Sequence, residues 1–237
     1  MIDNCRLCDA LSREGQKRPE NYPLLESQHF VVIPTVGQFV EGWVMAVSRS
    51  HRGSLQQHTR EELEDLRSIL KQAVKIVQAT YGQAIVFEHG PSDCLTLHGG
   101  CSIDHTHVHI APCRERERML SRIPFLPTTY CPIETVPSVV KPQCGYLIVG
   151  LAERLDNVAV YVVDEQLPRQ FLRQILATTV KAKQFWDWQC QNSYFTENIL
   201  WTIARMSQPF RSMANERCLY ENSQAIAGRD KISQSQC

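Results

Sequence analysis

The sequence predicts an α+β fold in which an antiparallel meander sheet packs against one long helix, followed by a smaller α+β carboxy-terminal segment. Three observations indicate this. Short apolar runs bounded by turn residues recur up to residue 112, one long amphipathic helix pattern lies among them, and a strand pair followed by a helix pattern comes after residue 143. With 237 residues and 43% hydrophobic content, the chain can bury one sizeable core or two modest ones.

Five strands and a helix are expected in the first module, which we assign to residues 1–113. The strands are the apolar runs at 23–27, 29–33, 42–48, 84–87 and 103–111. Thr59 and Glu62 form a capping-box pattern, and the apolar residues after them keep helical spacing up to Tyr81. Gly82 is typical of a helix end.

Proline-rich sequence follows the first module. The charged run at 114–118 is typical of a solvated helical turn, and the prolines after it predict a linker or an extended wrap over 114–142. The last residues, 213–237, are polar and lack periodicity, which predicts a disordered tail.

The carboxy-terminal segment, 143–212, is expected to contain a strand pair and a helix. The strands are predicted at 145–151 and 158–163, and a helix opens at Pro168. We expect this segment to cover the first module and to complete its substrate pocket. Arg169 and Arg173 lie one turn apart on the helix, where they either meet phosphates or are ordinary exposed arginines.

Composition excludes some classes of function. The formal net charge is zero, so a long nucleic acid is a less suitable partner than a small nucleotide. No apolar stretch of about 18 residues predicts a membrane span, and no secretory signal is recognised, so a cytoplasmic protein is expected. The ten cysteines are scattered, and in a reducing compartment they favour metal binding over disulfides.

Three histidines, His105, His107 and His109, alternate with other residues in the last predicted strand of the first module. Because side chains two residues apart in a strand lie on the same face, the three imidazoles form a row. A purely structural strand would place Val, Ile or Leu there. Just upstream, Gly100 allows close approach of the backbone to an anion, and Ser102 adds a hydroxyl.

The stretch Gly-Gly-Cys-Ser-Ile-Asp-His-Thr-His-Val-His-Ile resembles the signature of the histidine-triad family. The resemblance implies the predicted fold and a reaction at the phosphorus of a nucleotide. His107, the middle histidine, would attack phosphorus to form a covalent nucleotidyl-histidine, and His109 would lie beside the phosphate. Relatives with glutamine in the third position are typically transferases, so the histidine kept here favours a hydrolase of nucleotide phosphoramidates or dinucleoside polyphosphates, with a nucleotidyltransferase as the alternative.

Cys5 and Cys8 have a spacing that lets two thiolates bind one zinc ion, which for an isolated pair is as often coincidence as a site. The resemblance implies the remaining ligands, because zinc-bearing relatives complete the site with a histidine after a central strand and with the first triad histidine. Those positions are His51 and His105, and the zinc would be structural. His58 is a rival for His51 that fits better as an exposed polar residue.

The substrate-binding residues inferred around the triad include departures from the family pattern. Cys101 stands where glutamine is usual, Thr35 where an aspartate holds the ribose, and Glu88 where asparagine is common. The polar stretch 88–100 is interpreted as a lid or binding loop, or as a solvated connection. The substrate-binding residues predicted from this comparison are Gly100, Cys101, Ser102, Glu88 and His98.

Other interpretations stay open at this stage. The departures are compatible with a nucleotide-binding module that has lost catalysis, and His107 and His109 are compatible with a catalytic metal site in which a bound water attacks. The chain is expected to be either a homodimer or a monomer in which the carboxy-terminal segment acts as a partial repeat of the first module.

Overall fold

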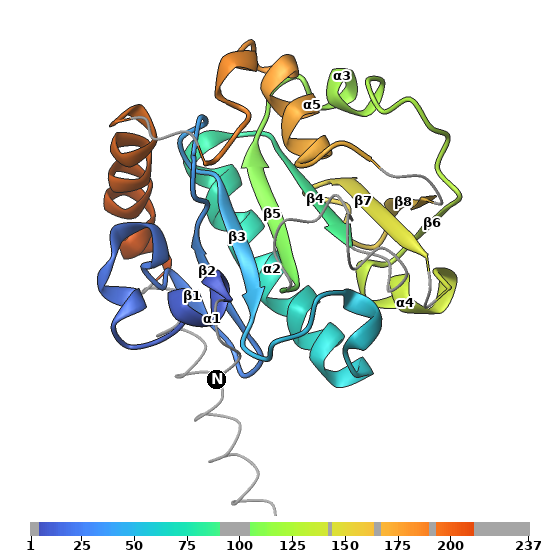
Figure 1. Ribbon diagram of the computed structural model, residues 1–237, viewed down its shortest axis with the longest axis horizontal. Helices are drawn as coiled ribbons and strands as arrows, with labels where there is room; N and C mark the ends of the chain where they lie inside the picture. Colours follow the sequence, from blue (N-terminus) through green and yellow to red (C-terminus); the bar gives the residue numbers. More distant parts are fainter. Residues whose placement is uncertain (1–4, 91–104, 142–143, 164–166, 190–192, 211–237) are drawn as a thin grey trace, which may run out of the picture.

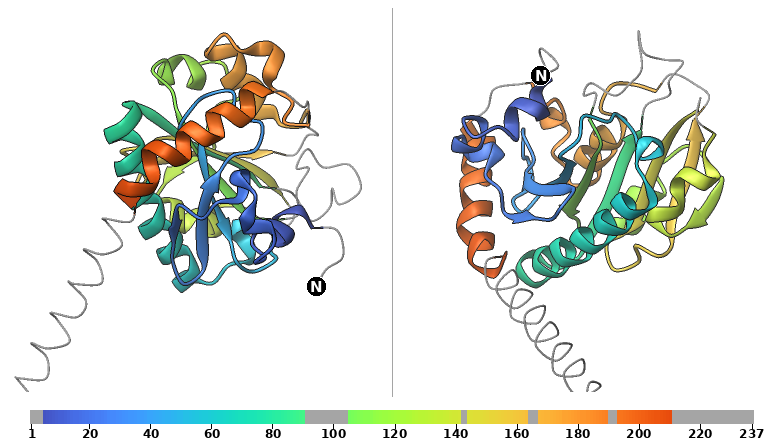
Figure 2. Two further views of the ribbon diagram at one scale, coloured as in Figure 1. Left: turned by 90° about the vertical axis from the view of Figure 1, so that its left-hand side faces the viewer. Right: turned by 90° about the horizontal axis from the view of Figure 1, so that it is seen from below.

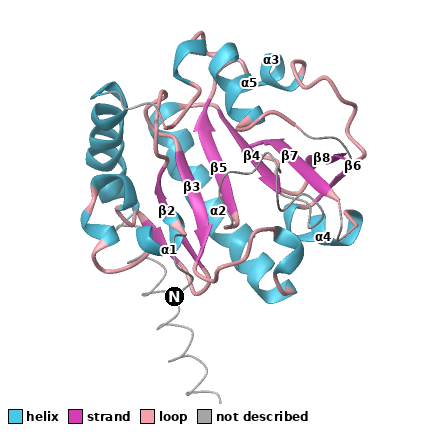
Figure 3. Cartoon of the chain, in the orientation of Figure 1, coloured by secondary structure: helices cyan, strands magenta, loops and turns pink. Residues whose placement is uncertain are grey.

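The computed structural model describes residues 5–90, 105–141, 144–163, 167–189 and 193–210. Its centre is one eight-stranded sheet in which every paired strand is antiparallel (Figures 1 and 3). This confirms the predicted α+β class with an antiparallel sheet and one long helix. The strands are β1 Leu25–Glu26, β2 Phe30–Pro34, β3 Val44–Ser48, β4 Ala84–Gly90, β5 His107–Pro112, β6 Thr129–Cys131, β7 Gly145–Leu151 and β8 Val158–Val163.

The long helix α2, Arg60–Tyr81, begins where the sequence predicted. The Thr59 hydroxyl accepts from the backbone N–H of Glu62, and the Glu62 carboxylate accepts from the N–H of Thr59, so both halves of the capping box form. The apolar stripe of α2 packs on one face of the sheet and forms the larger core with it (Figure 2).

Shorter helices complete the fold. The α-helices besides α2 are α1 Arg6–Ala10, α3 Arg116–Leu120, α4 Val136–Val139, α5 Phe171–Thr179 and a helix over 193–210. The 3₁₀ turns are η1 Gly15–Lys17, η2 Pro19–Asn21, η3 Leu55–Gln57, η5 Ile133–Thr135 and η6 Lys183–Phe185. Side chains of α3 and α5 join a second apolar cluster on the sheet face opposite α2. The sheet is therefore covered on both faces.

The strand order is β1-β2-β3-β5-β4-β7-β8-β6, which departs from a simple meander. The connection from β3 to β4 runs through α2 and leaves one strand position open between these two strands. The next strand, β5, fills that position. The triad strand thereby lies in the middle of the sheet with a hydrogen-bonded neighbour on each side. This central place holds the histidine side chains on a rigid support.

The prolines of the stretch 114–142 predicted a linker or an extended wrap. The stretch instead contains α3, β6 and α4. β6 pairs with β8, and β7 pairs with β4, so the carboxy-terminal strands extend the sheet of the first module. The 193–210 helix lies beside the β1 edge of the sheet (Figure 1), and its Asn198 and Thr202 hydrogen-bond to Gln38 in the connection between β2 and β3. The tail predicted at 213–237 lies outside the described residues. Within the described residues, no helix is long and apolar enough to cross a membrane.

Candidate functional site

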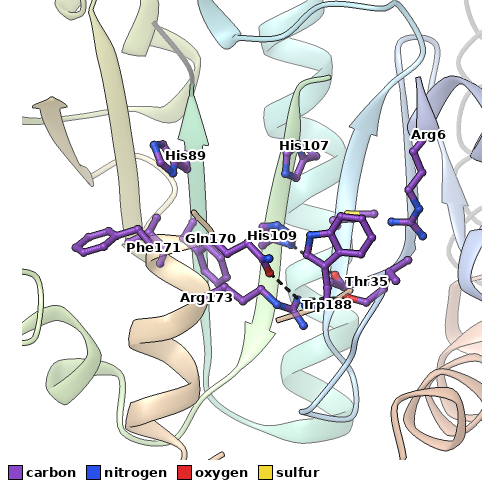
Figure 4. Close-up of a pocket in the computed structure, with 13 residues that line it drawn as sticks. Arg6, Thr35, His89, His107, His109, Gln170, Phe171, Arg173 and Trp188 are labelled. Atoms are coloured by element: carbon purple, nitrogen blue, oxygen red, sulfur yellow. Dashed lines mark hydrogen bonds between the residues drawn. The ribbon is translucent and has the colours of Figure 1, made fainter. Parts of the chain in front are cut away.

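A pocket lies on the sheet face opposite α2, and both His107 and His109 line it (Figure 4). Strand alternation explains their placement, since Val108 and Ile110 turn to the other face and pack in the α2 core. β4 adds Phe87 and His89, and α5 covers the pocket from the carboxy-terminal segment. The space between these side chains is about 640 Å³ when the solvent at its open mouth is included.

His107 has a fixed tautomer. Its Nδ1 lies 2.6 Å from the backbone carbonyl oxygen of His105, and a carbonyl only accepts hydrogen bonds, so Nδ1 carries the proton. The lone pair is therefore on Nε2. Burial lowers the pKa of His107 and keeps the ring neutral. A neutral, oriented imidazole with a free nitrogen is a competent nucleophile.

His109 has the opposite tautomer. The indole N–H of Trp43 donates to His109 Nδ1 at 3.2 Å, and an indole only donates, so Nδ1 is unprotonated and Nε2 carries the hydrogen. The Thr35 hydroxyl is 3.5 Å from the same Nδ1. Burial, with the nearby positive charge of Arg173, lowers the pKa of His109 well below its ordinary value. The ring is thus a neutral hydrogen-bond donor at the pocket.

Arg173 of α5 is buried beside the histidines. Its Nε donates to the Trp186 carbonyl at 2.6 Å, and its other nitrogens donate to the carbonyls of Val36 and Gly37. The guanidinium lies 4.5 Å from the ring centroid of Trp43, and burial lowers its pKa to about 9. Arg173 is therefore a buried residue of the pocket lining and not an ordinary exposed arginine, whereas its predicted contact with phosphate stays a prediction.

The pocket has a cationic and aromatic lining. Arg6 and Trp188 lie on one side of the triad histidines, and Phe171 lies on the other (Figure 4). Among the described lining residues there is no carboxylate. Carboxylates do lie near the two arginines, Asp187 near Arg173 and Glu20 and Asp9 near Arg6, but none of them lines the pocket. Positive charge at the described lining favours an anionic ligand, and aromatic rings offer stacking surfaces to a base.

A second cluster lies at the start of β5. Cys5, Cys8, His51 and His105 offer ligand atoms that all lie within 4.8 Å of one another. These are the four residues that the resemblance to the histidine-triad family predicted as metal ligands. Cys8 Sγ lies 3.2 Å from His51 Nδ1, and burial raises the pKa of the Cys8 thiol. Two thiols and two imidazoles at these distances could hold a tetrahedral metal ion.

The hydrogen bonds of His105 fit that use. The Ser48 hydroxyl donates to the Ser50 carbonyl, so at 3.1 Å its oxygen accepts from His105 Nδ1. Nε2 of His105 is then unprotonated, and this buried atom has no hydrogen-bond partner among the described residues. An unpartnered, buried nitrogen that faces two cysteines and a histidine has the surroundings of a metal ligand.

His58, the rival of His51, is buried and not exposed as expected. Its Nε2 donates to the Thr106 hydroxyl at 3.1 Å, and that hydroxyl donates to the Arg52 carbonyl. His58 therefore braces the backbone between His105 and His107 and lies outside the Cys/His cluster. Burial lowers its pKa to about 4.

Glu88 is not brought into the pocket, contrary to its predicted role in substrate binding. β4 continues to Gly90, so the alternation that places Phe87 and His89 at the pocket turns Glu88 to the α2 face. There it is 1% exposed and accepts from the Tyr146 hydroxyl at 3.2 Å. Four other predicted substrate-binding residues, His98, Gly100, Cys101 and Ser102, lie outside the described residues.

Some pocket residues were not predicted as a site. Arg6, His89 and Trp188 line the pocket, although His89 lay in the stretch interpreted as either a binding loop or a solvated connection. Thr35, which stands where relatives place a ribose-binding aspartate, also lines the pocket. His89 was detectable in principle, because it continues the alternation of β4. Arg6 and Trp188 are remote from the triad in sequence, and no local pattern connects them to it.

Comparison with known proteins leaves the function open. No family model and no curated protein matches the sequence. Among solved structures, a HIT family protein from Bacillus anthracis is similar at 17% identity and a TM-score of 0.39, over 47% of this chain and 74% of that one. It carries the name of the family that the triad residues resemble.

A second similar structure is yeast Ap4A phosphorylase Apa2 in complex with AMP. The identity is 14% and the TM-score 0.36, over 67% of this chain and 64% of that one. The same yeast enzyme in a separate structure gives 14% identity, a TM-score of 0.38, and coverage of 66% and 63%. This chain thus spans less than two thirds of the yeast phosphorylase, and the function has to be argued from the site itself.

Proposed function

We propose that this protein is a histidine-triad hydrolase that cleaves nucleotide phosphoramidates or dinucleoside polyphosphates through a nucleotidyl-histidine intermediate on His107. The observation that carries the proposal is the hydrogen bond from His107 Nδ1 to the His105 carbonyl, because it leaves Nε2 as the free nucleophilic nitrogen of a pocket-lining imidazole.

In the first step, the Nε2 lone pair attacks phosphorus, a P–N bond forms, and the bond from phosphorus to the leaving group breaks. The leaving group keeps the electron pair and departs as a phosphate anion or, if it is an amine, with a proton from solvent. The ring becomes an imidazolium, and its Nδ1–H stays hydrogen-bonded to the His105 carbonyl, which stabilises the new positive charge. His109 donates from Nε2 to the developing negative charge on the phosphoryl oxygens, and Trp43 holds it in the tautomer that can do so.

In the second step, water attacks the same phosphorus and the P–N bond breaks. The electron pair returns to Nε2, one water proton goes to solvent, and a nucleoside monophosphate leaves. The electropositive pocket supports both steps, since Arg173 and Arg6 contribute positive charge and no described lining residue is acidic. A catalytic metal held by both His107 and His109 is disfavoured, because His109 carries its hydrogen on Nε2 and accepts from Trp43 at Nδ1, so this ring has no free lone pair for a metal.

We further propose that Cys5, Cys8, His51 and His105 bind a structural zinc ion. The fit of the donor set and the unpartnered Nε2 of His105 support this. When bound, zinc supplies a crosslink between the amino-terminal residues and the strand that carries His107. The chemistry at phosphorus is left to the histidines.

The test uses turnover and adduct formation together. The parent protein and a His107→Ala variant are incubated with adenosine and guanosine phosphoramidates and dinucleoside polyphosphates, while product release and intact mass are followed. We expect turnover and a nucleoside-monophosphate adduct in the parent and neither in the variant. His29→Gln, at a histidine outside the pocket, is the matched control and should keep both. Absence of turnover and adduct in the parent across the panel would overturn the proposal.

A further inference from the structure

The two arginines of the pocket use their donors differently. Arg173 directs its Nε and both terminal nitrogens to backbone carbonyls, so it contributes charge but few hydrogen bonds to a ligand. Arg6 makes no hydrogen bond or ion pair with any residue in the described part of the chain that the structure records. Its planar fork of donors is available to an incoming anion.

Arg6 is nevertheless held in place. Its Cζ lies 4.8 Å from the ring centroid of Trp188, and both residues line the same pocket as His107 (Figure 4). Trp188 is itself anchored, since its backbone N–H donates to Gln170 of the turn that opens α5. At the other end, Arg6 lies between Cys5 and Cys8 of the Cys/His cluster. The half-buried Arg6 side chain is thus held at its backbone and at its guanidinium, and it is preorganised for binding.

The described lining residues of the pocket include no acid for an amine leaving group. No carboxyl group lines its described part, and the hydrogen bond that His109 Nδ1 accepts from Trp43 requires a neutral ring. Cleavage of a phosphoramidate P–N bond needs a proton on the departing amine, whereas a phosphate chain leaves as an anion and needs a cation to receive it.

We infer that Arg6, stacked on Trp188, is the specificity-determining residue that binds the phosphate chain beyond the attacked phosphorus, so that the substrates are nucleoside or dinucleoside polyphosphates in preference to phosphoramidates. This inference rests on the proposed function and names its substrate class. In the reaction, the bond from the attacked phosphorus to the bridging oxygen breaks, that oxygen keeps the electron pair, and Arg6 receives the departing anion.

The test compares ligands that differ by one phosphate and are not turned over. Calorimetric titrations with AMP, α,β-methylene ADP and inorganic tripolyphosphate are run on the parent and on Arg6→Gln. The parent should bind α,β-methylene ADP about tenfold more tightly than AMP, as expected for one charge-assisted contact. Arg6→Gln should remove this ratio and leave AMP affinity unchanged, and Arg6→Lys should restore part of it.

Two controls separate recognition from structure. Arg13→Gln removes an exposed arginine of the same amino-terminal segment and should keep the ratio. The bound metal per chain should be equal in the parent and Arg6→Gln, which shows that the Cys5–Cys8 segment is intact. The inference is overturned if the ratio survives in Arg6→Gln, if the parent shows no ratio, or if AMP and α,β-methylene ADP weaken equally.

Failure of the proposed function has a different signature. If no nucleotide binds and no His107 adduct forms, the proposal that this protein is a nucleotide hydrolase is refuted. Tripolyphosphate then decides about Arg6 alone: binding that Arg6→Gln abolishes upholds Arg6 as a phosphate-chain site, and no binding by the parent overturns it.

Discussion

Glu88 provides a test of the fold that is independent of catalysis. Its side chain is buried on the α2 face of the sheet, with the Tyr146 hydroxyl as its hydrogen-bond donor among the described residues. Burial raises the pKa of Glu88 from its ordinary 4.5 to about 8, against the smaller opposing effect of the Tyr146 hydrogen bond. The folded protein therefore keeps this acid protonated at pH 7, whereas the unfolded chain ionises it.

The sign and size of the effect follow from this difference. Below pH 4.5 both states hold the proton and the group is neutral in its effect on stability. As pH rises from 4.5 toward 8, Glu88 ionises in the unfolded chain but stays protonated in the folded protein. The unfolded state is therefore stabilised, and the free energy of unfolding falls by about 1.4 kcal/mol per pH unit. Between pH 5 and pH 8 the loss comes to about 3.5 kcal/mol, which is less than three full pH units would give because each state is partly ionised at one end of this range.

The assay is urea unfolding of the parent and Glu88→Gln at pH 5 and pH 8. The substituted amide keeps the shape of the side chain and the acceptor for Tyr146 but cannot ionise, so the variant should escape the loss and keep the kcat/KM of the parent. Glu61→Gln, at an exposed glutamate of α2, should show the pH dependence of the parent. Equal pH dependence in Glu88→Gln and parent would refute the buried, protonated acid, and lost turnover would return Glu88 to the pocket.

Three further predictions concern the two sites. Cys8→Ser should reduce the amount of bound zinc and lower the free energy of unfolding by about 3 kcal/mol or more, which corresponds to a fall in Tm of about 10 °C. Metal analysis and calorimetry would measure the two effects, and an unchanged Tm would contradict a structural metal. Gly37→Ala should lower the free energy of unfolding by about 1–3 kcal/mol and weaken nucleotide binding, because φ of Gly37 is +64° and the new Cβ would lie 2.6 Å from Trp188 Cα. Urea unfolding would measure the first effect and calorimetric titration the second. Trp43→Phe removes the indole donor that fixes His109, so single-turnover measurements should show slower adduct formation, and an unchanged rate would show that this tautomer is not needed.

Residue spacing was sufficient to predict the parts of the site that lie within one segment. Alternation along a single strand was enough to place His107 and His109 on one face. The capping box at Thr59 needs only residues one turn apart, and it forms as predicted. The Cys/His cluster joins distant segments, and it was predicted because the resemblance supplied the pairing that spacing alone left open.

Glu88 shows where this kind of reasoning fails. The strand was expected to end at residue 87, so the polar residues after it were interpreted as loop, although β4 keeps its alternation to Gly90. Where a strand ends is decided by its neighbours, and here β7 pairs with β4 along its last residues. Arg173 was undecided for the same reason, because only the docking of α5 on the sheet distinguishes a buried arginine from an exposed one.

The metal cluster and the pocket share their supporting segments. Just before β5, His105 belongs to the Cys/His cluster, while His107, the first residue of β5, lines the pocket. Arg6, the first residue of α1, also lines the pocket and lies in sequence between the two cysteines. Anything that loosens the cluster therefore displaces the nucleophile and the phosphate-chain arginine together, from two sides. Chelation should thus weaken α,β-methylene ADP binding more than AMP binding, since only the former uses Arg6, whereas a metal that merely stabilises the fold would weaken both alike.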